Sequence, residues 1–202
     1  LITSYKTDLI VETITTGVYS VNKFADATPL VVNYYDNYSF ISYLPIDKQV
    51  VAYQFKTGYD KAYPESAINY TELNANGLLT GTCTYYLDGS SNYSATAMYY
   101  DFRGQTVQTR TSNHLGGGDV TYNQYSFSGQ VTQSLKEHNT TTQSLITEYY
   151  INEYDFAGRL IKVKYKINDK PEVVLADMTE SGAYDELGRL RKKKRHNSVD
   201  LE

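Results

Sequence analysis

The chain has 202 residues, enough for one substantial core or two small ones, and its formal net charge is -4. This mildly acidic balance gives no global reason to expect nucleic acid or an anionic membrane as a partner. No apolar run approaches the roughly 20 residues that a transmembrane helix needs. The single cysteine, Cys83, excludes an intramolecular disulfide.

The composition is typical of strands and tight turns. The chain contains 22 Tyr and 13 Gly but no Trp and only 4 Pro. Aromatic and β-branched side chains suit a pleated surface, while Asn, Asp and Gly suit tight turns. The composition therefore predicts an all-β fold.

The first half of the chain has irregular strand signals. Residues 5–16, 30–36, 49–56 and 78–87 read as strands, with turns at Asn76 and Gly77 and at Asp88 and Gly89. Between Gly58 and Asn76 the periodicity weakens, which indicates a loop or one short helix. No linker separates the halves, so we expect a single unit over 1–200, with irregular or degenerate repeats in 1–97.

A short phrase recurs four times in the second half, roughly every 25 to 30 residues over 98–200. It places a Tyr, an Asp or Ser, two variable residues, a Gly and then Arg or Gln in order. Its key members are Tyr100, Asp101 and Gly104; Tyr125 and Gly129; Tyr154, Asp155, Gly158 and Arg159; and Tyr184, Asp185, Gly188 and Arg189. One period holds two strands and their turns.

Each phrase has the chemistry of a hairpin turn. The Asp or Ser side chain is expected to accept backbone N–H bonds two or three residues on, and the Gly supplies the positive φ. A three-residue type I loop closed by a glycine bulge fits the spacing. The Arg that follows the Gly is placed to reach back to the Asp, an exposed pair contributing about 0.5 kcal/mol.

The segment after Gly158 alternates like a half-buried strand. The odd-numbered residues from Ile161 to Ile167 are apolar, and the residues between them are Lys162, Lys164 and Lys166. We expect this strand to have one buried and one solvated side. Before Asp155, tyrosines occupy both faces, where their rings pack and their hydroxyl groups stay hydrogen-bonded.

The repeats resemble the YD-repeat, or Rhs-type, family, which takes its name from this Tyr-Asp phrase. The resemblance is specific at Tyr154 and Tyr184 and weaker at Tyr125, where Ser126 replaces the Asp. The stretch 98–117 is similar to Rhs-type proteins of Bacteroides and its relatives. The resemblance covers the second half and extends towards Gly77.

The resemblance implies a very large bacterial cell-surface or secreted protein with a long spiralling sheet of antiparallel strands. In relatives, that sheet curls into a hollow shell around a variable C-terminal toxin domain, and some members are linked to carbohydrate binding. The chain contains neither the toxin nor the self-cleaving segment of such relatives. It starts at Leu1 without a charged and then apolar leader, so we expect the export signal to lie outside it. Leu201 and Glu202 look like a cloning scar.

No pattern in the sequence indicates catalysis, a metal or a cofactor. The histidines His114, His138 and His196 lack ligand spacing, and Gly116 to Gly118 are not followed by the Lys and Ser or Thr of a phosphate loop. No nucleophile elbow is present, and Cys83 lies in an alternating strand, which places it in the core. We therefore expect no enzymatic activity. A polysaccharide-cleaving enzyme, which needs only two well-spaced carboxylates, remains the catalytic alternative.

The strongest charge cluster is the run 189–195, with six basic residues around Leu190. It follows the last phrase, where the repeat requires a return strand, and basic side chains on both faces of a strand oppose unwanted edge pairing. An anionic partner is the alternative interpretation.

The sequence thus predicts an all-β, curved open meander of antiparallel hairpins that serves as a non-catalytic segment of a shell or stalk. Its expected partner is the remainder of the parent repeat protein, without nucleic acid or membrane insertion. The alternative is a carbohydrate- or protein-binding module that uses exposed tyrosines, since aromatic faces stack on sugars and dominate protein interfaces.

Overall fold

The computed structural model describes residues 30–59, 74–90, 92–142 and 144–195. The expected strand over 5–16 lies outside the described residues, as does most of the segment between Gly58 and Asn76. These parts of the expected single unit over 1–200 stay predictions. The elements described below belong to one compact unit, Val31–Glu202.

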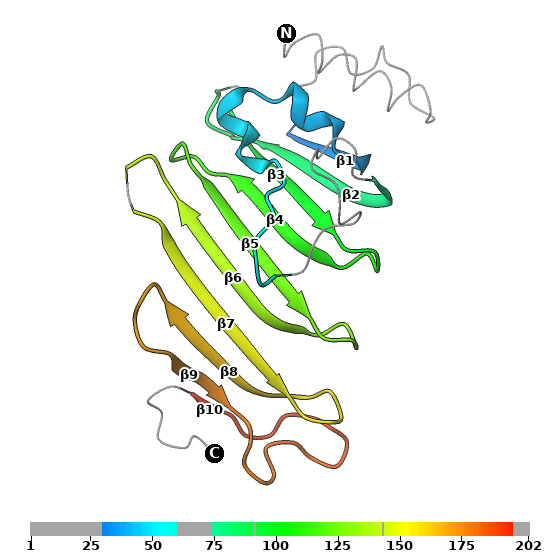
Figure 1. Cartoon of the computed structure of the whole chain (residues 1–202), viewed down its shortest axis with the longest axis vertical. Helices are drawn as coiled ribbons and strands as arrows, with labels where there is room; N and C mark the ends of the chain where they lie inside the picture. Colours follow the sequence, from blue (N-terminus) through cyan, green and yellow to red (C-terminus); the bar gives the residue numbers. More distant parts are fainter. Residues whose placement is uncertain (1–29, 60–73, 91, 143, 196–202) are drawn as a thin grey trace. The chain divides into compact units, whose positions relative to one another are not determined.

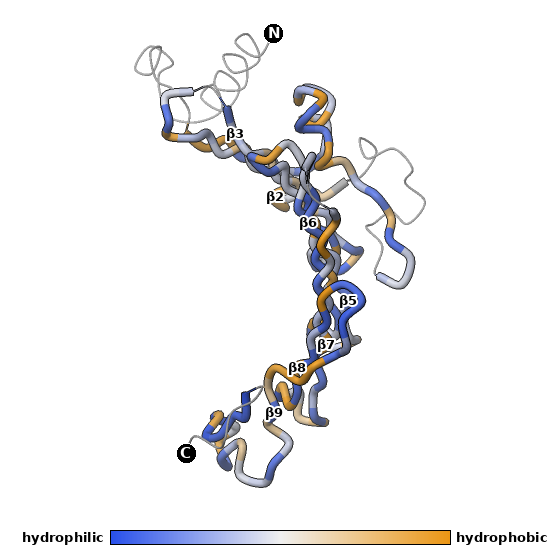
Figure 2. The backbone as a smooth tube through the Cα atoms, turned by 90° about the vertical axis from the view of Figure 1, so that its left-hand side faces the viewer, coloured by the Kyte–Doolittle hydropathy of each residue, from blue (hydrophilic) through white to orange (hydrophobic). Residues whose placement is uncertain are grey.

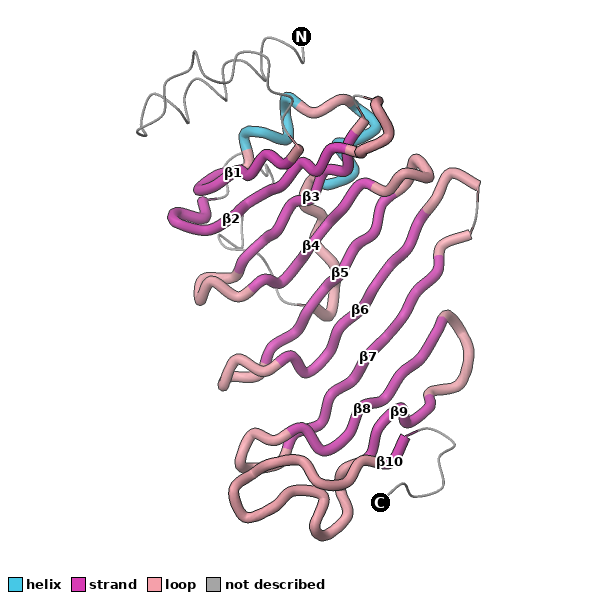
Figure 3. Tube along the Cα trace, turned by 180° about the vertical axis from the view of Figure 1, so that it is seen from behind, coloured by secondary structure: helices cyan, strands magenta, loops and turns pink. Residues whose placement is uncertain are grey.

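The described part of this unit is built on one sheet of ten strands that follow one another in sequence order (Figure 1). Every neighbouring pair is antiparallel, and the connections alternate between the two sides of the sheet at which the strands end (Figure 3). The strands are β1 Val31–Asn37, β2 Asn74–Tyr85, β3 Tyr93–Tyr100, β4 Thr106–Ser112, β5 Gly118–Tyr125, β6 Val131–Asn139, β7 Ile146–Tyr154, β8 Leu160–Ile167, β9 Val173–Asp177 and β10 Lys194–Arg195. The predicted all-β meander is confirmed.

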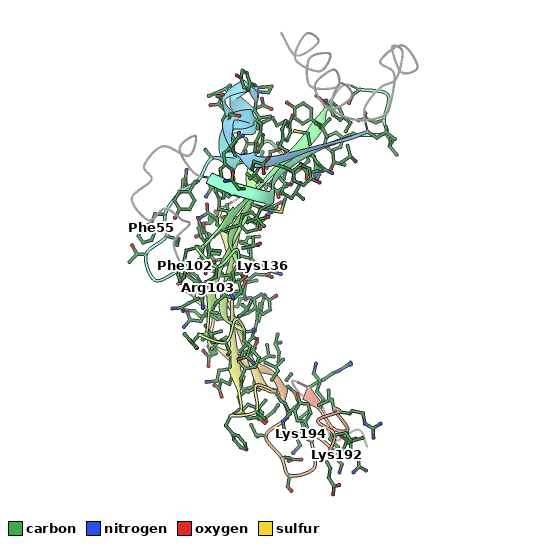
Figure 4. The ribbon with its side chains drawn as sticks, turned by 90° about the vertical axis from the view of Figure 1, so that its right-hand side faces the viewer. Phe55, Phe102, Arg103, Lys136, Lys192 and Lys194 are labelled. Carbon is green, nitrogen blue, oxygen red and sulfur yellow. The ribbon has the colours of Figure 1, made fainter. Side chains whose placement is uncertain are left out.

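The sheet is curved when seen edge-on (Figure 2), and the segment with two 3-10 helices, blue in Figure 4, lies on its convex side. These helices are η2 Ser39–Tyr43 and η3 Ile46–Val51, and together they form a cap: η3 packs on β3 and β4, and Phe40 of η2 packs at Gly81 of β2. The burial of β3 alternates strictly, because every second side chain lies beneath this cap. The largest apolar core of the described residues therefore lies between the cap and the first strands.

Tyrosine rings and hydroxyl groups attach the cap to the sheet. Tyr38 stacks on Tyr99 with ring centroids 4.7 Å apart, and its hydroxyl donates to the carbonyl oxygen of Met98 at 2.7 Å. The Tyr99 hydroxyl donates in turn to the carbonyl oxygen of Val51 at 2.7 Å. Burial is the main cause that raises the pKa of Tyr38 far above its ordinary value. Both side chains are fully buried and hydrogen-bonded, so ring packing and directional hydrogen bonds together hold the cap on the sheet.

The predicted strand over 49–56 is wrong, because its residues belong to η3 and to the extended segment that follows it. The backbone N–H and C=O groups of Gln54 bond to the side-chain amide of Gln108, at 3.3 and 2.7 Å, rather than to a neighbouring strand. Gln108 is 2% exposed. The alternating pattern thus reflects a segment that packs on a sheet face without joining the ladder.

The predicted turn at Asn76 and Gly77 is also wrong, because both residues lie within β2. The register between β1 and β2 shifts here, and Gly77 adopts φ +77°. The carboxylate of Asp36 accepts the N–H of Gly77 at 2.6 Å. The left-handed glycine therefore forms a bulge in a continuing strand. The predicted turn at Asp88 and Gly89 does connect β2 and β3.

Strands β7 and β8 form a single layer with both faces half-buried, so the prediction of one buried and one solvated side is wrong. The lysines expected in solvent pack on their neighbours instead. The Lys164 ammonium group bonds to Glu153 at 2.7 Å, and the Lys166 ammonium group lies 5.7 Å from the ring centre of Tyr149. Long side chains on adjacent strands cover each other on both faces where no second layer is present.

Candidate functional site

The four repeated phrases lie one after another along one side of the sheet, where the strands end (Figure 1). We call this the turn edge and define it as residues 101–105, 126–130, 155–159 and 185–189. Three of its turns join β3 to β4, β5 to β6 and β7 to β8, and the fourth lies between β9 and β10. The edge faces the viewer in Figure 4, where Phe102 and Arg103 are labelled on its first turn.

All four turns have the same backbone geometry. In the third turn, the N–H of Gly158 donates to the carbonyl oxygen of Asp155 at 2.9 Å, and the N–H of Asp155 donates to that of Arg159 at 2.9 Å. The turn glycines have φ between +75° and +85°. This is a three-residue type I loop closed by a glycine bulge.

The aspartate side chain organises each turn from within. Asp155 Oδ1 accepts the backbone N–H groups of Ala157 and Arg159, both at 2.9 Å. These donors lie two and four residues after the aspartate. The sequence predicts donors two or three residues on, so the second donor lies one residue further than predicted. In the second turn, Ser126 Oγ accepts one backbone N–H group, that of Gln130, at 3.1 Å. The serine therefore accepts one of the two backbone hydrogen bonds that the aspartate accepts in the third turn.

The arginine after the glycine reaches back to the aspartate in the last two turns. Arg159 Nε and Arg189 Nε each lie 2.7 Å from a carboxylate oxygen of Asp155 and Asp185. Backbone hydrogen bonding by the residue that carries this arginine is the main cause that lowers the pKa of both carboxyl groups, with the guanidinium group adding to it. In the first turn, Arg103 takes this place, with its Nε 3.2 Å from Asp101.

The tyrosine of each phrase binds the preceding repeat. The hydroxyl groups of Tyr125 and Tyr154 donate to the carbonyl oxygens of Thr106 and Val131, both at 2.9 Å. Each acceptor is the second residue after the preceding turn glycine. The other two pairs follow the same rule: Tyr184 donates to Leu160 and Tyr100 donates to Leu79, both at 2.6 Å.

The acceptor of Tyr100 lies in the β2 bulge rather than after a complete turn. Leu79 is the second residue after Gly77, the left-handed glycine of the β2 bulge. The bulge thus presents the same acceptor as a complete turn does. The tyrosine bond therefore keeps the same spacing from a left-handed glycine where that glycine lies inside a strand.

Successive turns also contact each other directly. Gln130 Nε2 donates to the carbonyl oxygen of Gly158 at 2.6 Å. A Cβ atom on Gly158 would lie 2.9 Å from that same Nε2 atom, and a Cβ atom on Gly129 would lie 2.9 Å from Gln105 Nε2. In the last pair of turns, the Arg159 guanidinium group lies 4.9 Å from the ring centre of Tyr184. The residue after one glycine therefore packs on the next turn.

Apolar side chains project from the turn edge into solvent. Phe127 and Phe156 are 101% and 103% exposed, and Phe102 and Leu187 are each 77% exposed. None of the four belongs to an apolar core of the described residues, and the ring centre of Phe102 lies 5.6 Å from the guanidinium carbon of Arg103 in its own turn. A row of exposed aromatic residues of this kind is the strongest interaction feature of the described residues.

The sequence predicts exposed tyrosines, but the most exposed aromatic side chains of the repeated turns are phenylalanines. Of the tyrosines in the described ranges, Tyr35 and Tyr43 alone are largely exposed. The others are buried or half-buried. The signal for the exposed row was present, because Phe follows the Asp or Ser in the first three phrases, at a position that a type I turn directs outward.

The basic run 189–195 forms less of a strand than the repeat predicts. Leu190 makes one isolated bridge to Tyr184, and regular pairing resumes only in β10, opposite Asp177 and Ala176 of β9. The N–H of Arg191 donates to the carbonyl oxygen of Ala183 at 2.8 Å. Lys194, labelled in Figure 4, pairs with Glu180. The run therefore begins at the last turn and ends in the two-residue strand β10.

The two histidines that the structure describes lie on different elements, and His196 lies outside the described residues. His114 is exposed on the connection between β4 and β5, whereas His138 of β6 pairs through Nδ1 with Asp119. Gly117 is held against the backbone of Asn139 and Thr140, in a connection that packs on its neighbour. Cys83 is buried at 2% exposure. Across 30–59, 74–90, 92–142 and 144–195, no group of three or more His, Cys, Asp or Glu side chains is arranged to hold a metal ion.

No protein-family model and no curated protein matches this sequence. Within the part of the chain that the structure describes, no helix has the length and apolar character needed to cross a membrane.

Proposed function

We propose that this chain is a non-catalytic wall segment of a large secreted or cell-surface YD-repeat protein from a bacterium. The observation that carries the proposal is the repeated bond from the tyrosine of one phrase to the backbone of the preceding repeat, as between Tyr154 and Val131. Each repeat docks on its sequence neighbours through the same donor and acceptor. Repeats that bind only their neighbours are the unit from which extended walls are made.

The half-buried strands support the same conclusion. Every residue of β7 and β8 is intermediate in exposure, so this part of the sheet is a layer rather than one side of a closed core. A compact catalytic or ligand-binding domain buries one face of its sheet. A wall needs only a stable layer, which cross-strand pairs such as Tyr150 and Tyr165, 5.0 Å apart, provide.

The protein-binding alternative has its own supporting observation, the row of exposed phenylalanines on the turn edge. The carbohydrate version relies on exposed tyrosines. Among the described residues only Tyr35 and Tyr43 are largely exposed, and both are far from the repeated turns in sequence, so few tyrosine rings are available to stack on a sugar. A glycan array with the whole chain tests it, and millimolar or tighter binding that Tyr43→Ala abolishes supports it.

Electron cryo-microscopy of the full-length parent protein tests the wall proposal. We expect β3 to β9 to be continued by further hairpins of the same kind, with their turns aligned on the turn edge. A parent in which this segment forms a closed domain with its own second layer contradicts the proposal. An antibody against the segment should label intact cells or the culture medium, and labelling only after lysis contradicts the proposed location.

A further inference from the structure

Residues 186–193 form the longest continuous exposed stretch among the described residues. The stretch arises because strand pairing is delayed after the fourth turn. Strands β4, β6 and β8 each begin two residues after their turn glycine, whereas β10 begins six residues after Gly188. Most of the basic run 189–195 therefore lies outside the ladder, and Lys192, labelled in Figure 4, is one of its exposed residues.

Few hydrogen bonds hold the backbone of this stretch. The N–H groups of Arg191 and Lys192 donate to the same acceptor, the carbonyl oxygen of Ala183, at 2.8 and 3.2 Å. Leu190 adds one isolated bridge, and β10 pairs with β9 over two residues. A segment with few backbone bonds and exposed side chains opens locally at a low cost in free energy. The run can therefore become extended while the longer strands stay folded.

The charge of the run specifies what acts on such an extended segment. Exposed chain with little regular structure is where proteases cut, and serine proteases with a carboxylate in their specificity pocket cut after Arg or Lys. We propose that the run 189–195 is a processing site for a protease of this trypsin-like class, with cleavage after Arg191, Lys192 or Lys193. Hydrolysis adds one water molecule across the peptide bond and leaves a carboxylate on the basic residue and an amino group on the next residue. The site does not rest on the proposed wall function, since it follows from the exposure, pairing and charge of the run.

Outside the run, the exposed basic side chains of the described residues lie on backbone that is held in place. Lys136 lies within β6, which pairs with β5 on one side and with β7 on the other. Arg103 lies in the first turn of the turn edge. Lys170 lies in a turn that its own N–H closes by donating to the carbonyl oxygen of Ile167 at 3.0 Å. A protease cleaves at such sites only after the hairpin or turn has opened, so the run is the preferred site among the described residues.

Cleavage in the run changes the end of the sheet. β10 is held on β9 by two residue pairs, Lys194 with Asp177 and Arg195 with Ala176. Once the chain is cut, these pairs and the exposed ion pair of Lys194 with Glu180 do not offset the conformational entropy of the released segment. β9, with the sequence Val-Val-Leu-Ala-Asp, then becomes the edge strand, and an open apolar edge is a template for pairing with another strand. Processing therefore converts a covered edge into an open one.

Digestion of the whole folded chain with trypsin, followed by mass spectrometry, tests the site. We expect cleavage within 191–193 to be about tenfold or more faster than at Arg103, Lys136 or Lys170, because cleavage at those three requires a turn or hairpin to open. The same digestion of the chain unfolded in urea is the control, and there the difference should disappear. Earlier cleavage at any of the three in the folded chain, or the same difference in the unfolded chain, overturns the proposal.

A matched pair of variants separates the run from other basic residues. The first variant replaces every basic residue after Leu190 by Gln: Arg191→Gln, Lys192→Gln, Lys193→Gln, Lys194→Gln and Arg195→Gln. It should slow the removal of the residues that follow the run by about tenfold or more. The second variant, Lys136→Gln with Lys170→Gln, should leave that rate unchanged. Equal rates in the two variants overturn the proposal.

The parent protein and the cut chain test the consequence of processing. Mass spectrometry of the parent protein, purified from its native source, should find copies that end within 191–193. Hydrogen exchange of the trypsin-cut chain should be faster in β9 than in the intact chain and unchanged in β3. An intact run in every copy of the parent, or undiminished protection of β9 after the cut, overturns the proposal.

Discussion

The hydroxyl group of Tyr154 donates a hydrogen bond of 2.9 Å to the backbone carbonyl oxygen of Val131, the second residue after the turn glycine of the preceding repeat. Tyr125 makes the corresponding bond to Thr106. Because the acceptor is backbone, the bond tolerates any side chain at that position. The tyrosine of the phrase therefore joins repeats, whereas the aspartate and glycine shape the turn within one repeat.

Tyr154→Phe should destabilise the chain by about 1 kcal/mol, because it removes one hydrogen bond and keeps the ring. Asn152 Nδ2 also donates to Val131 at 2.9 Å and limits the loss. Combining Tyr154→Phe with Asn152→Ala should therefore cost more than the two single changes together, since the carbonyl then loses both donors. Urea unfolding measures these differences.

Tyr149→Phe, on the same strand, is the control for this prediction. The Tyr149 ring packs beside the Lys166 ammonium group, and the turn-edge bonds do not involve its hydroxyl. Its change should shift the urea midpoint much less than Tyr154→Phe does. Equal shifts would show that the hydroxyl of Tyr154 has no special structural role.

Gly158→Ala should cost more than Gly89→Ala, although both glycines have similar positive φ values, +80° and +78°. A Cβ atom on Gly89 meets nothing within 4 Å, whereas one on Gly158 lies 2.9 Å from Gln130 Nε2. The backbone strain, about 1 kcal/mol, is common to both, and the contact with the preceding turn is additional. In a Gln130→Ala background the two substitutions should become similar in thermal unfolding. A persistent difference there argues against turn-to-turn packing.

Acid should weaken the last two turns. The folded pKa of Asp155 and of Asp185 lies below the ordinary carboxyl value. Their contribution to stability is therefore complete above the unfolded pKa, near pH 4, and is lost as the pH falls through the folded pKa. Asp155→Asn with Asp185→Asn should lower stability at pH 7 and flatten its decline below about pH 4. Parallel stability curves for the variant and the parent chain would contradict this origin of acid sensitivity.

Gly81→Ala should disrupt the seating of the cap. A Cβ atom there would lie 2.2 Å from Cζ of the buried Phe40 ring, which stacks on Tyr34 at 4.4 Å. Overpacking of this kind costs about 1–3 kcal/mol. The same change in a Phe40→Leu background should cost much less, because the ring tip is gone. Unfolding free energies of the four proteins give the coupling, and a coupling near zero contradicts the contact.

The turns were predictable because their information is local. Asp155 and Gly158 define a hairpin turn with chemistry that lies within five consecutive residues. The meander order followed from the spacing of such turns. The exposed phenylalanines were equally readable from their position in the turn, whereas the abundance of tyrosine does not show which rings the fold covers.

The errors arose where distant residues decide the structure. Residues 49–56 alternate like a strand, but their backbone partner is the side chain of Gln108, which no local pattern reveals. Gly77 resembles a turn glycine, but Asp36 on β1 holds its N–H in a bulge. The alternation of β8 leads to a buried face only where a second layer covers the strand. The 3-10 helices of the cap pack on the first strands of the sheet and not on β8, which no pattern within β8 reveals.

Residue-resolved hydrogen exchange of Tyr154→Phe against the parent chain tests most directly the claim that repeats are held by their neighbours. We expect faster exchange in β5 to β8, the two hairpins that the bond from Tyr154 on β7 to Val131 on β6 joins, and unchanged protection in β2 and β3 beneath the cap. Uniformly faster exchange through all these strands would show that the sheet unfolds as one cooperative core, which contradicts the account.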